Sequence, residues 1–153
     1  MKNNIMTHTN EVTDKLNDLL EKNYDAEAGY IAAKDHVENP QLKEFFKDRA
    51  TDRYDFGHEL KEEIRLFSEA PDKGTSLKGD AHRIWMDLKS KFTDDTEEAI
   101  LEEAVRGEEH ALEDYNEILN DMTLAPSTEE MLKKQRDSVK AALKSVKTFE
   151  KIS

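Results

Sequence analysis

Apolar residues recur along this chain at intervals of three and four, the spacing that lines up side chains on one face of an α-helix. The first such segment predicts a helix from about Thr9 to Val37. Its stripe is Val12, Leu16, Leu19, Asn23, Ala26, Tyr30, Ala33 and Val37, with Leu20, Glu27 and Ile31 beside it. Glu38-Asn39-Pro40 then predicts a stop and an immediate restart, because Asn is a favourable N-cap and Pro suits the first helical position. A second helix, antiparallel to the first, should follow. Its stripe is Leu42, Phe46, Arg49, Arg53, Phe56, Leu60, Ile64 and Phe67.

The second half of the chain repeats this arrangement. A third helix is predicted from about Asp95 to Met122, with Asp95 and Glu98 in the spacing of a capping box. Leu124-Ala125-Pro126 ends it, and Ser127 with Glu130 predicts a second capping box that starts the last helix. These two helices should form another antiparallel pair. The stripe of the third helix is Leu101, Ala104, Glu108, Ala111, Tyr115, Ile118 and Met122, and that of the last is Leu132, Gln135, Val139, Ala142, Val146 and Phe149.

A long connection, from Glu69 to Asp94, joins the two pairs. Its second part is periodic again and predicts a short fifth helix, with Trp85 against the bundle. The residues that would share one face there are Ala81, Trp85, Leu88 and Phe92. A connection of this length lets the chain cross from one end of a bundle to the other. We therefore predict a single all-α domain over residues 1–153, a four-helix bundle with a crossover connection.

The composition supports this fold class and excludes several functions. Charged residues make up 38% of the chain, which has only five glycines and three prolines, so a turn-rich β fold is disfavoured. The net charge of −12 disfavours nucleic acid and anionic membrane surfaces as partners. Because the chain has no cysteine, carboxylate and imidazole groups would have to bind any metal. It also shows no signal-like or membrane-spanning apolar segment, so we expect a cytoplasmic protein.

One polar residue interrupts the apolar stripe of the third helix. Glu108 stands where an apolar residue is expected, and a buried carboxylate requires a metal, a cation or hydrogen-bond donors. A weak internal similarity between the two halves places Glu27 at the matching position of the first helix. Counting outward from the turns predicts that Glu27 lies level with Asp52 and Arg53, and that Glu108 lies level with Ala142 of the last helix.

Several stretches resemble a known family. The segment His82-Arg83-Ile84-Trp85-Met86-Asp87-Leu88-Lys89-Ser90, followed by Ile100-Leu101-Glu102-Glu103 and Arg106-Gly107-Glu108, is similar to a bacterial ferritin-like four-helix-bundle family whose domain has no assigned function. The resemblance extends from Leu16 to the last helix. Members often read Glu-Arg-Gly-Glu where this chain has Val105-Arg106-Gly107-Glu108, so one carboxylate is missing here. The resemblance implies a ferritin-like architecture, in which ferritins and rubrerythrins hold two irons, and it allows a role in bacterial stress physiology; it does not by itself imply iron.

We favour the interpretation that Glu108 belongs to a polar core network and not to a metal centre. In this network Glu27 and Glu108 pair with Arg49 and Arg53, because the planar guanidinium group binds two carboxylate oxygens and stays charged when buried. Such a protein would be non-catalytic and would need no cofactor. Tyr30 and Tyr115 lie on the stripes near Glu27 and Glu108, where a phenol can either hydrogen-bond a carboxylate or fill space, and of these two roles we favour packing.

Two alternatives stay open. The first is a metal-binding protein, either an iron-storage or di-iron oxidase or peroxidase-like protein, or one that holds a single divalent cation on Glu27, Asp52 and Glu108. A di-iron site of this architecture needs Glu-x-x-His on two helices, and the chain contains no such motif. The second alternative is an acidic protein-interaction module that binds a protein partner or forms a homo-oligomer.

Overall fold

The computed structural model of the chain describes residues 2–67 and 97–152, and within these ranges it contains helices and no strand. The helices are α1 (Lys2–His36), α2 (Pro40–Phe67), α4 (Glu97–Asp121) and α5 (Pro126–Ile152). The prediction of an all-α protein with four long helices is confirmed for these residues. The predicted connection with its fifth helix and Trp85, and the Asp95 end of the first capping box, lie outside the described residues.

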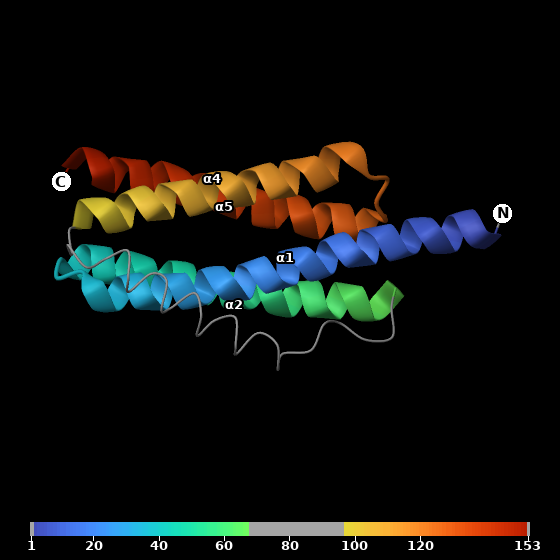
Figure 1. Ribbon diagram of the computed structural model, residues 1–153, viewed down its shortest axis with the longest axis horizontal. Coiled ribbons are helices and arrows are strands. Elements are labelled where there is room, and N and C mark those ends of the chain that lie inside the picture. The colour runs from blue at the N-terminus through green and yellow to red at the C-terminus, as the bar shows by residue number, and fades with distance from the viewer. Residues whose placement is uncertain (1, 68–96, 153) are drawn as a thin grey trace.

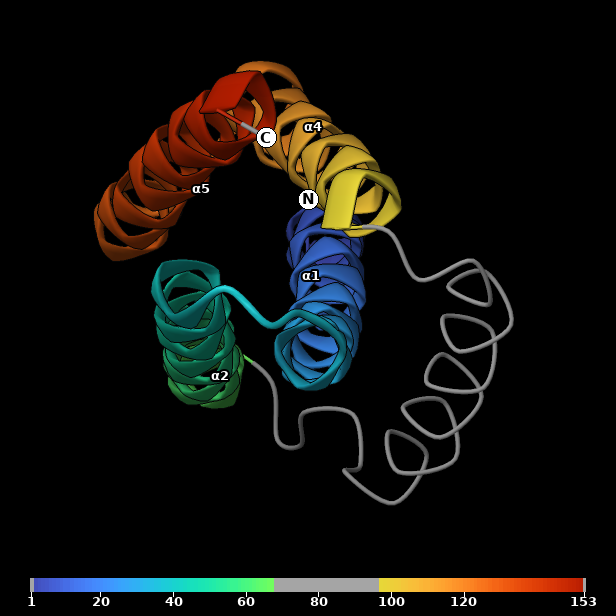
Figure 2. The same ribbon diagram turned by 90° about the vertical axis from the view of Figure 1, so that its left-hand side faces the viewer.

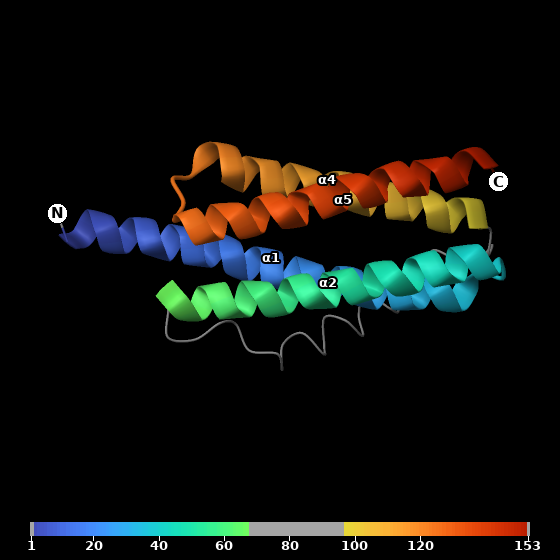
Figure 3. The ribbon, with the colours of Figure 1, turned by 180° about the vertical axis from the view of Figure 1, so that it is seen from behind.

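The helices form two antiparallel pairs, α1 with α2 and α4 with α5 (Figure 1). The end-on view in Figure 2 shows that α1 lies beside both α2 and α4, and that α5 lies beside both α4 and α2. Seen from behind, α2 and α5 run in opposite directions (Figure 3). Neighbouring helices are therefore antiparallel, whereas α2 and α4 occupy opposite corners and run the same way. It follows that α2 ends and α4 begins at opposite ends of the bundle (Figure 1).

The start of α2 is capped as predicted. Asn39 Oδ1 accepts hydrogen bonds from the backbone N–H groups of Gln41 and Leu42, at 2.9 and 3.4 Å. Glu97, the first residue of α4, also binds this turn. Its Oε1 accepts hydrogen bonds from the backbone N–H groups of Glu38 and Asn39, at 3.3 and 3.2 Å. The first residues of α4 are thereby joined to the α1–α2 turn.

The start of α5 differs from the predicted capping box. α5 begins at Pro126, so Ser127 already lies inside the helix and is not its N-cap. The hydroxyls of Ser127 and Thr128 instead donate to Oε1 of Glu63 on α2, at 2.8 and 2.7 Å. Glu63 is buried near the helix N-terminus, where the helix dipole favours a negative charge. This contact joins the two pairs at the other end of the bundle.

Two apolar clusters fill the interior. One lies towards the α1–α2 turn and contains Tyr30, Ala33, Val37, Leu42, Phe46, Ala50, Ile100, Leu101 and Val146. The other lies towards the α4–α5 turn and contains Leu16, Leu19, Leu20, Leu60, Ile64, Tyr115, Ile118, Leu132 and Val139. On three of the four described helices, the residues between these clusters include a buried polar side chain, namely Asn23 on α1, Arg53 on α2 and Glu108 on α4. The site described below is built around these three residues.

One glycine is required by close packing. A Cβ atom added to Gly57 on α2 would overlap Cε1 and Cζ of the Tyr24 ring on α1. The Tyr24 ring also lies 6.4 Å from the Tyr54 ring, measured between centroids, and beneath the Lys61 ammonium group. Because these neighbours limit the movement of the ring, the absent side chain at Gly57 sets how closely α1 approaches α2.

Candidate functional site

A buried ion pair links helices at opposite corners of the bundle. Arg53 of α2 and Glu108 of α4 are 5% and 2% exposed. Arg53 Nη2 donates to Glu108 Oε1 at 2.6 Å, and the hydroxyl of Tyr30 on α1 donates to the same oxygen at 2.6 Å. Both short bonds are to a carboxylate oxygen, which makes them stronger than bonds between neutral groups. The structure thus brings Glu108 together with one of the two arginines that the sequence proposed for it.

The hydrogen bonds continue from Arg53 to a second residue of α1, Asn23, two turns before Tyr30. Arg53 Nη1 donates to Asn23 Oδ1 at 2.8 Å. The amide nitrogen of Asn23 donates to the Leu19 carbonyl at 2.8 Å and to the Tyr115 hydroxyl at 3.0 Å. Asn23 is almost completely buried, and its amide uses both its oxygen and its nitrogen in this chain of bonds.

The chain of bonds ends on α5 and α2. Tyr115 donates to Gln135 Oε1 at 2.6 Å, and Gln135 Nε2 donates to Glu59 Oε1 at 3.1 Å. All four described helices therefore contribute to one polar network. We call it the polar layer, and its members are Asn23, Tyr30, Arg53, Glu59, Glu108, Tyr115 and Gln135. Buried polar groups are stabilising only when their hydrogen bonds are made, so the layer holds the four helices in one arrangement.

Burial in this layer changes the acidity of both tyrosines. Desolvation raises the pKa of Tyr115 to about 12, although the positive charge of Arg53 and the hydrogen bond from Asn23 act in the opposite direction. Desolvation also raises the pKa of Tyr30 well above its ordinary value, and the adjacent Glu108 charge adds to the shift. Both phenols are therefore neutral hydrogen-bond donors at pH 7. The expectation that Tyr30 and Tyr115 only fill space is wrong, because each donates to a buried acceptor.

Arg53 stays protonated despite its burial. Desolvation is the largest influence and lowers the Arg53 pKa, but the negative charge of Glu108, supported by Tyr30 and Tyr115, outweighs it and leaves the pKa raised. The guanidinium group is consequently a permanent positive charge beside Glu108.

Glu27 does not join the polar layer. It is half-buried, and this burial raises the Glu27 pKa, although the interaction with His58 on α2 acts in the opposite direction. With 3.6 residues per turn, Glu27 points about 60° away from Tyr30 around the helix axis. Tyr30, and not Glu27, therefore faces Glu108.

Arg49 and Asp52 pair with each other instead of with the buried carboxylates. Arg49 Nη1 lies 2.8 Å from Asp52 Oδ2, one turn along α2, and its guanidinium group lies over the Phe45 ring at 5.4 Å. Burial raises the pKa of Asp52, and the charge of Arg49 lowers it. Both side chains are partly exposed. The structure therefore does not place Arg49 and Asp52 beside Glu108.

Within the part of the chain that the structure describes, the donors near Glu108 do not fit a metal ion. No group of three or more histidine and carboxylate side chains in these ranges is arranged to hold one. The nearest partner of Glu108 is a guanidinium group and not a second carboxylate, so a divalent cation would lack the ligands that balance its charge. On α5, the Tyr115–Gln135 contact sets the alignment and places Ala142, which cannot bind metal, level with Glu108. The three carboxylates that the sequence proposed as metal ligands, on Glu27, Asp52 and Glu108, do not converge.

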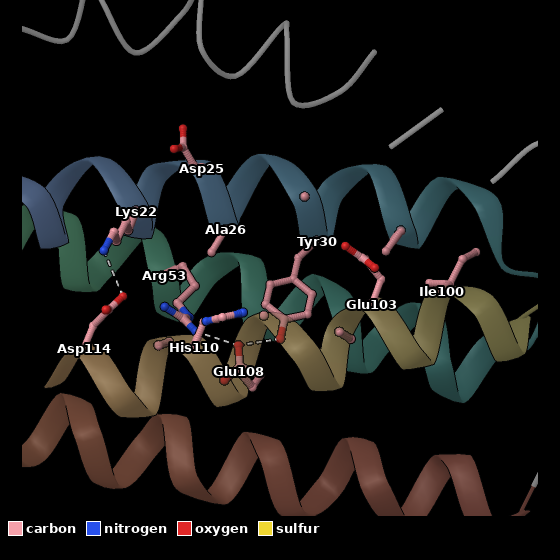
Figure 4. A pocket seen from close by; sticks show the side chains of 15 residues that line it. Lys22, Asp25, Ala26, Tyr30, Arg53, Ile100, Glu103, Glu108, His110 and Asp114 are labelled. Carbon is pink, nitrogen blue, oxygen red and sulfur yellow. Dashed lines mark hydrogen bonds and ion pairs between the residues drawn. The ribbon is translucent and has the colours of Figure 1, made fainter. Parts of the chain in front are cut away.

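A groove of about 470 Å³ runs between α1 and α4, beside the ion pair. Six small residues line its two walls: Ala26, Gly29, Ala33, Ala104, Gly107 and Ala111. Tyr30, Arg53 and Glu108 also border it, and Figure 4 shows their side chains converging between the two helices. The exposed ion pair between Lys22 and Asp114, at 3.0 Å, connects α1 to α4 at one end of the groove (Figure 4).

One oxygen of Glu108 has no partner among the described residues. Arg53 and Tyr30 both donate to Oε1, while Oε2 is buried and accepts no hydrogen bond. A buried carboxylate oxygen without a donor is energetically costly. This oxygen belongs to a residue that lines the groove, and no sequence pattern distinguishes it from Oε1.

In residues 2–67 and 97–152, the fold and the site define an all-α protein with four helices and a buried arginine–glutamate pair between them. Residues 11–121 match a family described as a domain of unknown function (DUF2383), and the chain belongs to that family. This match begins within α1, ends with α4 and includes both residues of the ion pair. The prediction of a family whose domain has no assigned function is thereby confirmed. No curated protein matches the chain. None of the described helices is sufficiently long and apolar to span a membrane.

Proposed function

We propose that this chain is a non-catalytic, ferritin-like four-helix bundle in which a buried ion pair occupies the position of a metal centre. The observation that carries this proposal is the 2.6 Å contact between Arg53 and Glu108, both almost fully buried. In a ferritin-like site, a carboxylate at the bundle centre faces a metal cation. Here a guanidinium group supplies the positive charge, and it neither dissociates nor changes oxidation state.

The arrangement of the helices supports the ferritin-like part of the proposal. Bundles of this class have one crossover connection between two antiparallel pairs. α2 and α4 run in the same direction, so that α2 ends and α4 begins at opposite ends of the bundle, as such a connection requires (Figure 1). The donor set supports the non-catalytic part, because the hydrogen-bond partners of Glu108 are a guanidinium group and a phenol.

Metal titration tests this proposal. Protein purified without added metal is analysed for its elemental content, and thermal unfolding is recorded with and without excess Fe²⁺, Mn²⁺ or Zn²⁺. A metal that binds only the folded state stabilises it by about 2.7 kcal/mol at a hundred times its Kd. We expect a much smaller shift, no ferroxidase activity and no stoichiometric iron.

Two variants make the result specific to the site. Glu108→Gln removes the charge of the central carboxylate, and Glu63→Gln makes the same change at another buried carboxylate, outside the polar layer. A large stabilisation by metal that Glu108→Gln abolishes and Glu63→Gln leaves intact would overturn the proposal. So would two metal ions bound near Glu108 in a crystal.

A further inference from the structure

We propose that the groove between α1 and α4 binds a primary aliphatic amine, whose ammonium group donates a hydrogen bond to Glu108 Oε2 and whose hydrocarbon chain lies along the small residues of the two walls. The inference goes beyond the non-catalytic role proposed above. It rests on the unpartnered oxygen, the shape of the groove and the charge around it.

The unpartnered oxygen specifies a hydrogen-bond donor. Glu108 is 2% exposed, and its Oε2 accepts no hydrogen bond within the described residues. Tyr30 and Arg53 hold Oε1 from two directions and so fix the carboxylate in place (Figure 4). A ligand that supplies an N–H group to Oε2 would satisfy the remaining acceptor without disturbing these bonds.

The shape of the groove specifies a slender hydrocarbon. Its volume of about 470 Å³ lies within the range of small-molecule sites, which is roughly 300 to 1,000 Å³. Gly107 lies in the middle of α4, where glycine weakens a helix, and a Cβ atom added to it would meet no described residue within 4 Å. Packing among the described residues therefore does not explain this glycine. Its effect is to widen the groove directly beside Glu108.

The charge around the groove specifies a cation. Its lining contains four carboxylates, on Asp25, Glu103, Glu108 and Asp114, against the two positive charges of Lys22 and Arg53. Arg106, which is outside the lining, pairs with Glu103, so the carboxylates exceed the positive charges beside the groove by one, in a chain whose net charge is −12. A carboxylate ligand would be repelled and a neutral alcohol would gain nothing from this field, whereas an ammonium group is attracted. The ammonium group is also compact and carries three donors.

The probe is n-hexylamine, titrated into the full chain at pH 7 and followed by the backbone amide signals in two-dimensional NMR. 1-Hexanol and hexanoate, which have the same hydrocarbon chain, serve as neutral and anionic comparisons. We expect saturable shifts for n-hexylamine centred on residues 26–33 and 104–111. Its affinity should exceed that of 1-hexanol by about tenfold or more, as a charged hydrogen bond provides, and hexanoate should not bind.

Two substitutions locate the site without touching the polar layer. Gly107→Leu places an alkyl side chain in the groove and should abolish the shifts. Ala141→Leu adds similar bulk at an exposed position of α5, away from the groove, and should leave binding unchanged. Glu108→Gln should weaken n-hexylamine about tenfold or more if the variant is folded.

Three outcomes would overturn the proposal. The first is that n-hexylamine causes no saturable shift, so that only water occupies the groove. The second is that n-hexylamine and 1-hexanol bind equally well, which would remove the role of Glu108. The third is that Gly107→Leu binds n-hexylamine as the unchanged protein does, which would place the bound amine elsewhere on the surface.

Discussion

Replacing Arg53 by Met removes the positive charge of the ion pair but keeps an unbranched side chain of similar length. Glu108 then retains Tyr30 as its donor but loses the guanidinium group, and Asn23 Oδ1 loses its donor as well. Since breaking a buried ion pair leaves an uncompensated charge, the expected loss in the free energy of unfolding is roughly 3 to 5 kcal/mol. That is a large fraction of the total stability of an ordinary domain.

The second substitution distinguishes an ion pair from a simple packing defect. In Arg53→Met/Glu108→Leu no charge is stranded, but the Tyr30 hydroxyl loses its acceptor, which costs about 1 to 3 kcal/mol. Removing the stranded charge gains more stability than the unpaired Tyr30 hydroxyl costs. We therefore expect the double variant to be more stable than Arg53→Met by roughly 1 to 3 kcal/mol. A gain from a second core substitution is not expected of residues that do not touch.

The assay is urea unfolding followed by far-ultraviolet circular dichroism, with the slope m compared between variants to verify that the extent of unfolding is unchanged. Arg49→Met is the matched control, made on the same helix. Arg49 pairs with Asp52 at a partly exposed site, so its loss should cost less than about 1 kcal/mol. The reasoning fails if Arg53→Met costs no more than Arg49→Met, or if the effects of Arg53→Met and Glu108→Leu are additive.

Further predictions concern the glycines, the buried phenol and the α2–α5 contact. Gly107→Ala should raise the free energy of unfolding by about 0.5 to 1 kcal/mol, because its Cβ meets no described residue. Gly57→Ala should lower the free energy of unfolding by about 1 to 3 kcal/mol, because its Cβ overlaps the Tyr24 ring. Thermal unfolding that shifts in the same direction for both variants would contradict this packing. The folded state raises the pKa of Tyr115 to about 12, so its contribution to stability should be complete below about pH 10 and lost as the pH rises through about 12. Urea unfolding over this range should show a flatter alkaline decline for Tyr115→Phe, and superimposable profiles would argue against the shift. Thr128→Val removes a hydroxyl donor from the buried carboxylate of Glu63 and should lower the free energy of unfolding in urea by about 1 kcal/mol. Thr148→Val, at an exposed helix position, should cost less. Equal losses would show that the α2–α5 contact contributes nothing.

The helices and their alignment within each pair were predictable because the sequence carries both periodicity and clear breaks. Asn39 and Pro40 set the first turn, and α2 begins where they predict. In the second pair, Tyr115 and Gln135 lie equally far from Ala125, and their hydrogen bond shows that counting from the turn gives the correct levels. Short turns leave little freedom for one helix to slide along the other, which is why the count works.

The partners of Glu108 were only partly predictable. Periodicity places a residue on a stripe, but the stripe of α1 is wide enough to face both α2 and α4, and the sequence does not say which flank meets which neighbour. Glu27 and Tyr30 illustrate this, since only Tyr30 turns towards α4. A usable signal was present in Asn23 and Gln135, because a polar amide on an apolar stripe usually has a buried partner.

The position of the polar layer explains how the two pairs keep one alignment. Contacts between pairs are less extensive than those within them, so apolar packing alone constrains the alignment weakly. If one pair slid by a helical turn, about 5.4 Å, the two apolar clusters would still meet apolar surface, but Arg53 and Glu108 would separate and be buried against hydrocarbon. Charged and amide groups penalise such a displacement steeply because their bonds depend on distance and direction. The contacts of Glu97 with the α1–α2 turn and of Glu63 with α5 repeat this constraint at the two ends of the bundle, so polar bonds oppose sliding in either direction at three levels.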